Sequence, residues 1–100
     1  MSEAKKIPAW LVLSVDGVTI HLSKPSSLNG IVADKVTMRA PTVRDVRAAS
    51  VTANGDEEQR ELNLFATLAE VGVKDLDDLH LKDYKRLQSG YFRMVDDDGL

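Results

Sequence analysis

The chain has no cysteine among its 100 residues, and this absence removes several kinds of site at once. No disulfide framework, thiolate nucleophile or cysteine metal site is available. The apolar stretch after the N-terminus runs only from Ile7 to Leu13 and is broken by Pro8, which makes it too short for a membrane span. It also lacks a small-residue cleavage site. We therefore expect a protein of a reducing cytosol that is neither secreted nor inserted in a membrane.

Aromatic residues are also scarce, at 5% of the chain, but 43% of the residues are hydrophobic and 29% are charged. This composition is typical of a chain that folds rather than of a disordered one. One hundred residues make about one modest domain with a single core. We expect a single domain over residues 1–100, with flexible tails at residues 1–8 and 96–100.

A hairpin is expected around Asp16-Gly17, a dipeptide that accepts the positive φ values of a tight turn. It separates two candidate strands, residues 10–14 and 19–23. With Asp16 and Gly17 as the two loop residues, an apolar face would be formed by Val15 with Val18, Leu13 with Ile20, and Leu11 with Leu22. The opposite, more polar face would carry Ser14 with Thr19, Val12 with His21, and Trp10 with Ser23.

A second turn at Asn29-Gly30 returns the chain into a third strand over residues 35–40, which completes a three-stranded antiparallel meander. Regular pairing about this turn would place apolar and polar residues on the same face. A one-residue offset repairs the pattern. We expect this bulge, or the end of the regular strand, at Pro25, which has no amide hydrogen to give to a ladder.

Three helices are expected after the strands, which gives an α+β fold. The first starts at Thr42, with Asp45 three residues later, presents Val43, Val46 and Ala49 on one face, and stops near Asn54-Gly55. The second opens with three acids, residues 56–58, and ends at Gly72.

A short acidic turn or helix over residues 75–79 precedes the third helix, residues 81–95. Tyr84, Leu87, Tyr91 and Met94 share one face of that helix. Gly90 costs about 1 kcal/mol relative to Ala within a helix, so the last turns are either held by packing or frayed.

The charge is distributed unevenly. Residues 1–53 carry seven Lys and Arg against four Asp and Glu, a net +3, whereas residues 54–100 carry six against twelve, a net −6. Phosphate would be repelled by the acidic half, although Arg39, Arg44 and Arg47 form a small basic patch. A helix-turn-helix DNA reader is also disfavoured, because the helix that would enter the groove starts with acids. We expect no nucleic acid partner.

Catalysis and metal binding find little support in the sequence. His21 and His80 lie far apart in the chain, and neither has an acid at a spacing that suggests a shared metal. The acids at residues 75–78 fail the calcium-loop pattern, because the required glycine and glutamate are His80 and Arg86. No nucleophile elbow or glycine-rich phosphate loop occurs. We expect no enzyme, no cofactor and no metal.

The order of these features resembles the small tail assembly chaperones of contractile-tailed phages of the Mu and P2 type. That family has a glycine turn, a strand closing in an Arg-x-Pro-Thr-like segment, a helix with an early Asp, an acidic leucine-bearing helix, and a Leu-x-x-Leu stretch before Asp-Tyr. The matching residues are Gly30, Arg39, Pro41, Thr42, Asp45, Leu76, Leu79, Asp83 and Tyr84. The resemblance spans about residues 22–92. The strand expected at residues 10–15 lies ahead of it, where it would cap the sheet or mediate self-association.

The resemblance implies a non-enzymatic protein of the bacterial host cytoplasm that is absent from the mature virion. Such a protein would hold the tape measure protein soluble and assist tail tube assembly, with the tape measure and tail tube proteins as partners. Two alternatives remain: a small DNA-binding or antitoxin-like regulatory protein, and a minor structural tail component. A homo-oligomer is left open.

Candidate partner contacts fall into an apolar and a basic set. The apolar set is Tyr84, Leu87, Tyr91, Phe92 and Met94, and the basic set is Arg39, Arg44 and Arg47. We expect the arginines to form a polar rim or an intramolecular clamp onto the acidic helices. The alternative for the apolar stripe is the core, and the alternative for the arginines is solvated surface.

Overall fold

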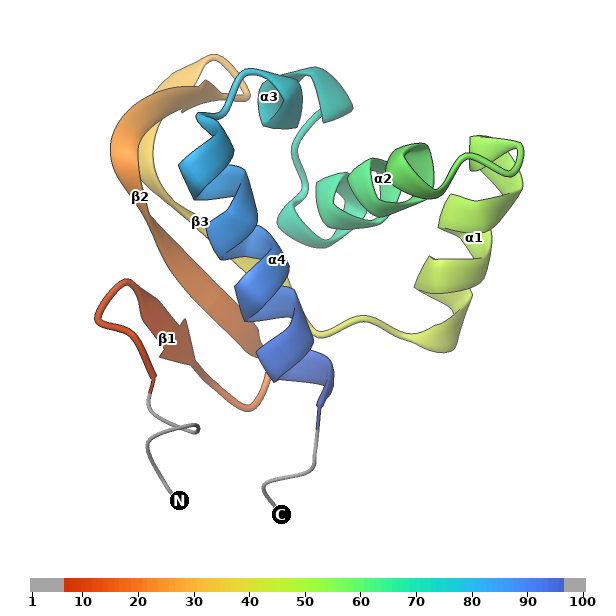
Figure 1. The fold of residues 1–100 in the computed structure, drawn as a ribbon, viewed down its shortest axis with the longest axis horizontal. Coiled ribbons are helices and arrows are strands. Elements are labelled where there is room, and N and C mark those ends of the chain that lie inside the picture. Colours follow the sequence, from red (N-terminus) through yellow and green to blue (C-terminus); the bar gives the residue numbers. More distant parts are fainter. Residues whose placement is uncertain (1–6, 97–100) are drawn as a thin grey trace.

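The computed structural model describes residues 7–96, which form a sheet followed by helices (Figure 1). The elements in chain order are β1 (Leu11–Leu13), β2 (Gly17–Leu28), β3 (Ile31–Arg39), α1 (Val43–Ala53), α2 (Glu57–Ala69), α3 (Val73–Asp77) and α4 (Leu81–Val95). The sheet is antiparallel with the order β1-β2-β3, so the predicted α+β class and the three-stranded meander are confirmed. The open choice at residues 75–79 is settled by α3, a helix of five residues.

The first hairpin has a different register from the predicted one. Leu11 pairs with Ile20 and Leu13 with Val18, so the loop moves to residues 14–16 and Val15 is 97% exposed instead of lying on the apolar face. The reason is Gly17, which belongs to β2 and pairs with Arg39. A Cβ at Gly17 would overlap the Met38 carbonyl oxygen, so this glycine serves close strand approach rather than a positive φ.

Trp10 is also displaced from its predicted position. Its carbonyl accepts the His21 amide at 2.8 Å, so it lies opposite His21 and not opposite Ser23. The Trp10 ring is half-buried against the core, with the Arg86 guanidinium 5.1 Å from the ring centroid. This geometry is that of a cation–π contact.

The predicted turn of the second hairpin, at Asn29-Gly30, is confirmed. The φ angles of these residues, 56° and 79°, suit a tight hairpin. The predicted irregularity at Pro25 is present, but it is larger than predicted. His21 pairs with Lys35 and Ser26 with Ala33, so residues 22–25 lie opposite one residue and the offset is three, not one. The predicted offset of one and the observed offset of three are both odd numbers of residues. Either one returns the apolar side chains of β2 and β3 to the same face of the sheet, which packs on the core.

The α1 helix begins as predicted. The Thr42 side chain accepts from the Asp45 amide, and the Asp45 side chain accepts from the Thr42 amide, which forms a capping box. The helix ends at Asn54, whose φ is 54°. Its buried face differs from the predicted one, because Val43 is 76% exposed while Ala49 and Ala53 are buried. The helix therefore rests on small residues.

The end of α2 corrects the prediction that Gly72 terminates this helix. The helix stops at Glu70, which adopts a left-handed conformation with a φ of 59°. Gly72 has a φ of −80° and instead precedes α3 as its N-cap. The β2–β3 turn packs at this junction, because the Asn29 amide donates to Asp75 at 3.1 Å and its side chain donates to the Glu70 carbonyl at 3.0 Å.

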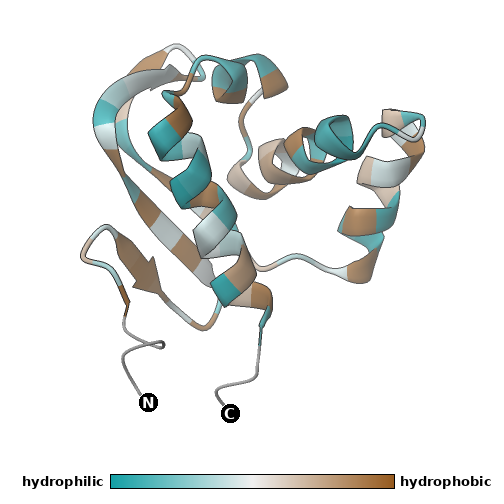
Figure 2. Cartoon of the chain, viewed as in Figure 1, coloured by the Kyte–Doolittle hydropathy of each residue, from teal (hydrophilic) through white to brown (hydrophobic). Residues whose placement is uncertain are grey.

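The core lies between the sheet and the helices, with α4 against β1 and β2, and α2 against β3. Its largest fully buried side chains are Phe65, Ile20, Met38, Leu68, Leu76, Leu87 and Val18. Figure 2 shows hydrophobic residues along β1 and in the last turn of α4, where the helix passes the sheet.

Gly90 is held by packing, which decides the alternative left open by the sequence. A Cβ on this residue would lie 2.6 Å from Ile20 Cδ1 and 3.3 Å from Leu11 Cδ1. The glycine therefore lets α4 approach β1 and β2 closely.

The predicted flexible tails, residues 1–8 and 96–100, fall mostly outside the described residues. Within those residues, the Pro8 carbonyl accepts the Leu11 amide at 3.1 Å and the Asp96 amide donates to the Phe92 carbonyl at 3.0 Å. Residues 8 and 96 thus belong to a turn and a helix end. Residues 1–6 and 97–100 lie outside the described part of the chain.

Candidate protein-interaction site

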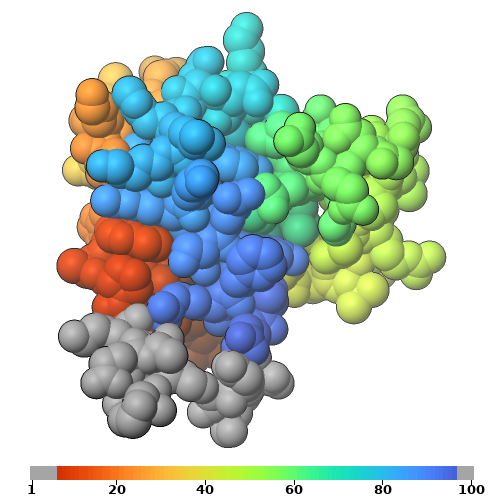
Figure 3. Space-filling model, viewed as in Figure 1, coloured from red at the N-terminus to blue at the C-terminus, as the bar shows by residue number. Residues whose placement is uncertain are grey.

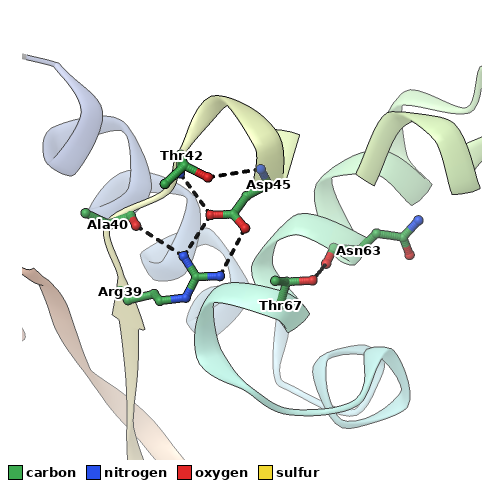
Figure 4. Close-up of polar contacts among 6 residues, drawn as sticks. All are labelled: Arg39, Ala40, Thr42, Asp45, Asn63 and Thr67. Atoms are coloured by element: carbon green, nitrogen blue, oxygen red, sulfur yellow. Dashed lines mark hydrogen bonds and ion pairs between the residues drawn. The ribbon is translucent and has the colours of Figure 1, made fainter. Parts of the chain in front are cut away.

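Arg39 forms an intramolecular clamp, as one reading of the arginines expected, but the clamp acts on α1 rather than on the acidic helices. Its guanidinium contacts both Asp45 carboxylate oxygens, at 2.7 and 3.0 Å (Figure 4). This hydrogen bond, followed by the bond from the Thr42 amide, holds the pKa of Asp45 well below its usual range. The side chain of Arg39 is therefore committed to ordering the β3–α1 connection.

Arg44 and Arg47 lie apart from this clamp, on the exposed side of α1. Within residues 7–96, no ion pair joins either guanidinium to an acid. The structure therefore separates the three predicted arginines into one structural residue and two solvent-facing residues.

Asparagine and threonine side chains fix α1 against α2. Asn63 donates to the Thr52 hydroxyl at 3.0 Å and accepts from the Gln59 side chain at 2.9 Å. Within α2, Thr67 donates its hydroxyl to the Asn63 carbonyl at 3.0 Å, so this bond does not join the two helices (Figure 4). Because α1 has its main contacts with α2 and few with the rest of the fold, its other side is left to solvent.

Asp83 is the one buried charged residue of the described chain, and it lies under the irregular part of β2. Its carboxylate accepts the amides of Ser23 at 2.7 Å and Lys24 at 3.3 Å. Burial alone raises the pKa of Asp83, but these amides and the nearby Arg86 charge outweigh it, so the pKa lies below its ordinary value. The matching Asp-Tyr motif thus has a structural Asp.

Arg86 adds a second link between α4 and β2, because its guanidinium donates to the His21 carbonyl at 2.9 Å. Neither histidine takes part in a metal cluster: within the described residues, no group of three or more His, Cys, Asp or Glu side chains could hold an ion. Every buried side-chain nitrogen or oxygen in that part of the chain also has a partner. No helix among residues 7–96 is long and apolar enough to cross a membrane.

A groove of about 420 Å³ lies between α2, α3 and α4, on a surface that sequence reasoning did not identify. Leucines and Tyr84 line it together with Glu58, Glu61 and Asp77, and Lys85 contributes one opposing charge. The only sequence signal was the mixture of leucines and acids in these three segments. The elements that line the groove meet where α4 (blue) adjoins α2 (green) in Figure 3.

The surroundings of Tyr84 show that carboxylates dominate this groove. Its hydroxyl donates to Glu61 at 2.8 Å, and the Gln88 side chain donates to the same oxygen at 2.8 Å. Burial, then the hydrogen bond to Glu61, then the charges of Glu61, Asp77 and Glu58 raise the pKa of Tyr84 above its ordinary value. Several carboxylates therefore act on the same small region.

The predicted apolar stripe of α4 divides between core and surface. Leu87 is fully buried, so it offers no area to a partner. Tyr91 is half-buried, with its ring 5.2 Å from Phe65, and Met94 is likewise half-buried against the core. Phe92 is 62% exposed. The stripe is thus mainly core. Phe92, which does not share its face, is the most exposed residue of the predicted apolar set.

Other exposed apolar residues lie at the same end of the molecule as Phe92. Because α4 runs from the Ser23 end of β2 toward Gly90 beside Ile20 and Leu11, its last turns lie next to the β1–β2 loop (Figure 1). Val15 in this loop is 97% exposed, and Val95 is 45% exposed. Leu13, at the end of β1, is 37% exposed. We call Leu13, Val15, Phe92 and Val95 the apolar end.

The chain matches a protein-family model over most of its length. Residues 19–96 match the model of a protein family described as "Phage tail assembly chaperone proteins, E, or 41 or 14". The matched range begins within β2, so β1 lies ahead of it, and it ends one residue after α4. No curated protein and no solved structure matches the chain.

Proposed function

The chain belongs to the phage tail assembly chaperone family, and on that premise we propose that it binds the tape measure protein and assists tail tube assembly around it. The family match over residues 19–96 carries this proposal. The protein acts by binding and without catalysis, in the cytoplasm of the bacterial host, and it leaves before the virion is complete. Tail tube subunits displace it from the tape measure protein.

The apolar end supports this role with a surface of suitable chemistry. A long tape measure chain would present apolar side chains that aggregate if left in contact with water, and exposed apolar surface on a small folded domain can cover them. Phe92 is the anchor, because an exposed aromatic side chain offers a large contact area at low cost in conformational entropy. The half-buried Tyr91 ring lies 5.9 Å from the Phe92 ring and supports it.

Binding has to be reversible, because the tube replaces the chaperone. Several copies that each make a modest contact are easier to displace than one obligate interface. The net charge of −3 helps such a complex to remain soluble.

A co-expression experiment tests the apolar end. The double variant Phe92→Ser/Val95→Ser removes accessible apolar area and leaves every buried core side chain in place, and we expect it to lower the affinity for a tape measure fragment by about tenfold or more. The measurement is the soluble yield of the fragment, together with its dissociation constant by titration calorimetry.

Ile31→Ser/Val32→Ser is the matched control, because these residues are 70% and 73% exposed at the β2–β3 turn, away from the apolar end. Retained binding by Phe92→Ser/Val95→Ser, with an unchanged circular dichroism spectrum, would show that another surface is used. Mass spectrometry of purified virions tests the non-structural role, and the chain should be absent from them.

A further inference from the structure

The acidic groove is a second surface with a defined chemistry, separate from the apolar end. Leu81 is 68% exposed at its edge, and Leu62 and Tyr84 are half-buried within it. Glu58 and Asp77 are exposed carboxylates that line it, and Glu61 accepts the Tyr84 hydroxyl. Lys85 is the one cation among the lining residues, so carboxylates outnumber it three to one. An occupant that fits this groove presents small apolar side chains together with positive charge.

The outer face of α1 has the complementary composition. Ala49 and Ala53 face the core, and the residues on the opposite side of the helix are Arg44, Arg47 and Val51. Val51 is 77% exposed, Val43 at the edge of this face is 76% exposed, and both arginines are exposed. No ion pair within the described residues neutralises these two arginines.

We propose that the outer face of α1 (Val43, Arg44, Arg47 and Val51) docks into the acidic groove between α2, α3 and α4 of a second copy of this chain. The arginines then meet Glu58 and Asp77, and the valines contact the leucines of the groove. The two surfaces match both in the sign of their charge and in their exposed apolar area.

The two surfaces cannot pair within one molecule. The buried side of α1 rests on α2, so its outer face points away from the body, and α1 and α2 form the projecting side of the molecule in Figure 3. The contact therefore uses different patches on the two copies, which makes it heterologous. A heterologous contact that does not close into a ring continues from copy to copy.

Sedimentation of the isolated chain tests this docking, and it needs no tape measure protein, so its outcome is independent of the proposed function. We expect the average mass to increase as the concentration of the chain is raised from about 10 µM to about 1 mM. Added salt should lower the average mass, because it screens an interface that depends on charge. Arg44→Glu/Arg47→Glu and Glu58→Lys/Asp77→Lys should each weaken association by about tenfold or more.

Mixing these two charge-reversed variants is the decisive arm. The first carries an acidic α1 face and an acidic groove, and the second carries a basic α1 face and a basic groove, so each groove meets an opposite charge in the mixture. Association should return when they are combined. Lys24→Glu/Lys35→Glu lowers the net charge by the same amount as Arg44→Glu/Arg47→Glu, but at exposed positions of the sheet, and it should leave association near the wild-type level.

Three results would overturn the proposal. They are a wild-type chain that stays monomeric throughout the concentration range, a loss of association in the Lys24→Glu/Lys35→Glu control as large as in the α1 variant, and a mixture that stays dissociated. Circular dichroism of each variant confirms that the fold is retained, which is expected because all the altered side chains are exposed.

Discussion

Asp83 connects α4 to an irregular stretch of β2 by accepting the amides of Ser23 and Lys24, two residues that have lost their ladder partners on β3. An unpaired amide in a buried setting costs free energy comparable to a lost hydrogen bond. The carboxylate satisfies two amides at once, and Pro25 next to them has no amide to satisfy. The irregularity therefore depends on a single side chain from another element.

Replacing Asp83 with Asn should destabilise the fold by about 2 kcal/mol at pH 7, since one amide then faces an NH₂ group instead of an oxygen. The pKa of Asp83 is lowered in the folded state, so its contribution is present above about pH 4, the ordinary Asp value, and is lost as the pH falls through the folded pKa. The difference between wild type and Asp83→Asn should therefore shrink at low pH. Urea unfolding at pH 7 and pH 3 measures it.

Asp78→Asn is the matched control, because Asp78 is an exposed carboxylate just beyond α3. It should change the free energy of unfolding by only a few tenths of a kcal/mol. An equal loss in both variants would mean that negative charge in general, and not the contact with the strand, stabilises the fold.

Among single residues, the sequence predicted best those whose roles are local. Thr42 and Asp45 lie three residues apart, so their capping box follows from helix geometry alone. The position of the irregularity was also predictable from Pro25 and the alternation of apolar residues. Its size was not, because it depends on Asp83, which is 60 residues from Ser23 in the chain.

At the level of elements, the α2–α3 junction holds a non-glycine residue in a conformation that favours glycine. Glu70 has a φ of 59°, and an L-residue pays roughly 1–2 kcal/mol for such a conformation. The carbonyl of this residue also accepts the Asn29 side chain at 3.0 Å, which fixes the β2–β3 turn against the junction. The turn and the helix end thus order each other.

Glu70→Gly should stabilise the protein by about 0.5–1 kcal/mol, because relief of the strained φ exceeds the extra entropy of glycine in the unfolded chain. Thermal unfolding measures the gain. Glu70→Ala removes the same charge but keeps a Cβ, so it should give no gain. If alanine stabilised as much as glycine, the benefit would come from removing the charge rather than from the backbone.

The elements also show where sequence reasoning reached its limit. The number and order of the strands and the three longer helices follow from turns, caps and apolar spacing. The expected strands, residues 19–23 and 35–40, were too short, because β2 and β3 continue to the Asn29-Gly30 turn. The register of β1 does not, because Gly17 is fixed by the approach of Met38 and Arg39 from another strand. The acidic groove was missed for the same reason: it exists only where α2, α3 and α4 meet.

At the scale of the whole molecule, Gly90 sets the distance between the helix layer and the sheet. Its position beside Ile20 and Leu11 lets α4 lie directly on β2 and β1. Ile20 is fully buried, so its Cδ1 has little free volume into which it could move.

Gly90→Ala should have two opposing effects of similar size on the free energy of unfolding. Better helix propensity gains about 1 kcal/mol, whereas overpacking costs typically 1–3 kcal/mol. We expect a net loss of about 1 kcal/mol, measured by chemical denaturation. Ile20→Val deletes the Cδ1 that the new methyl would meet, so the double variant should be more stable than the sum of the two single changes predicts. A stabilising Gly90→Ala would indicate that the layers separate easily.

The link between Asp83 and β2 also bears on how this domain is made. Ser23 leaves the ribosome 60 residues ahead of the carboxylate that receives its amide, so the sheet cannot reach its final bent form while only the hairpins have been synthesised. Until α4 has been synthesised, the amides of Ser23 and Lys24 bond to water instead of to Asp83. We therefore expect the irregular part of β2 to form late, and a nascent chain halted before Asp83 to be readily cleaved by proteases.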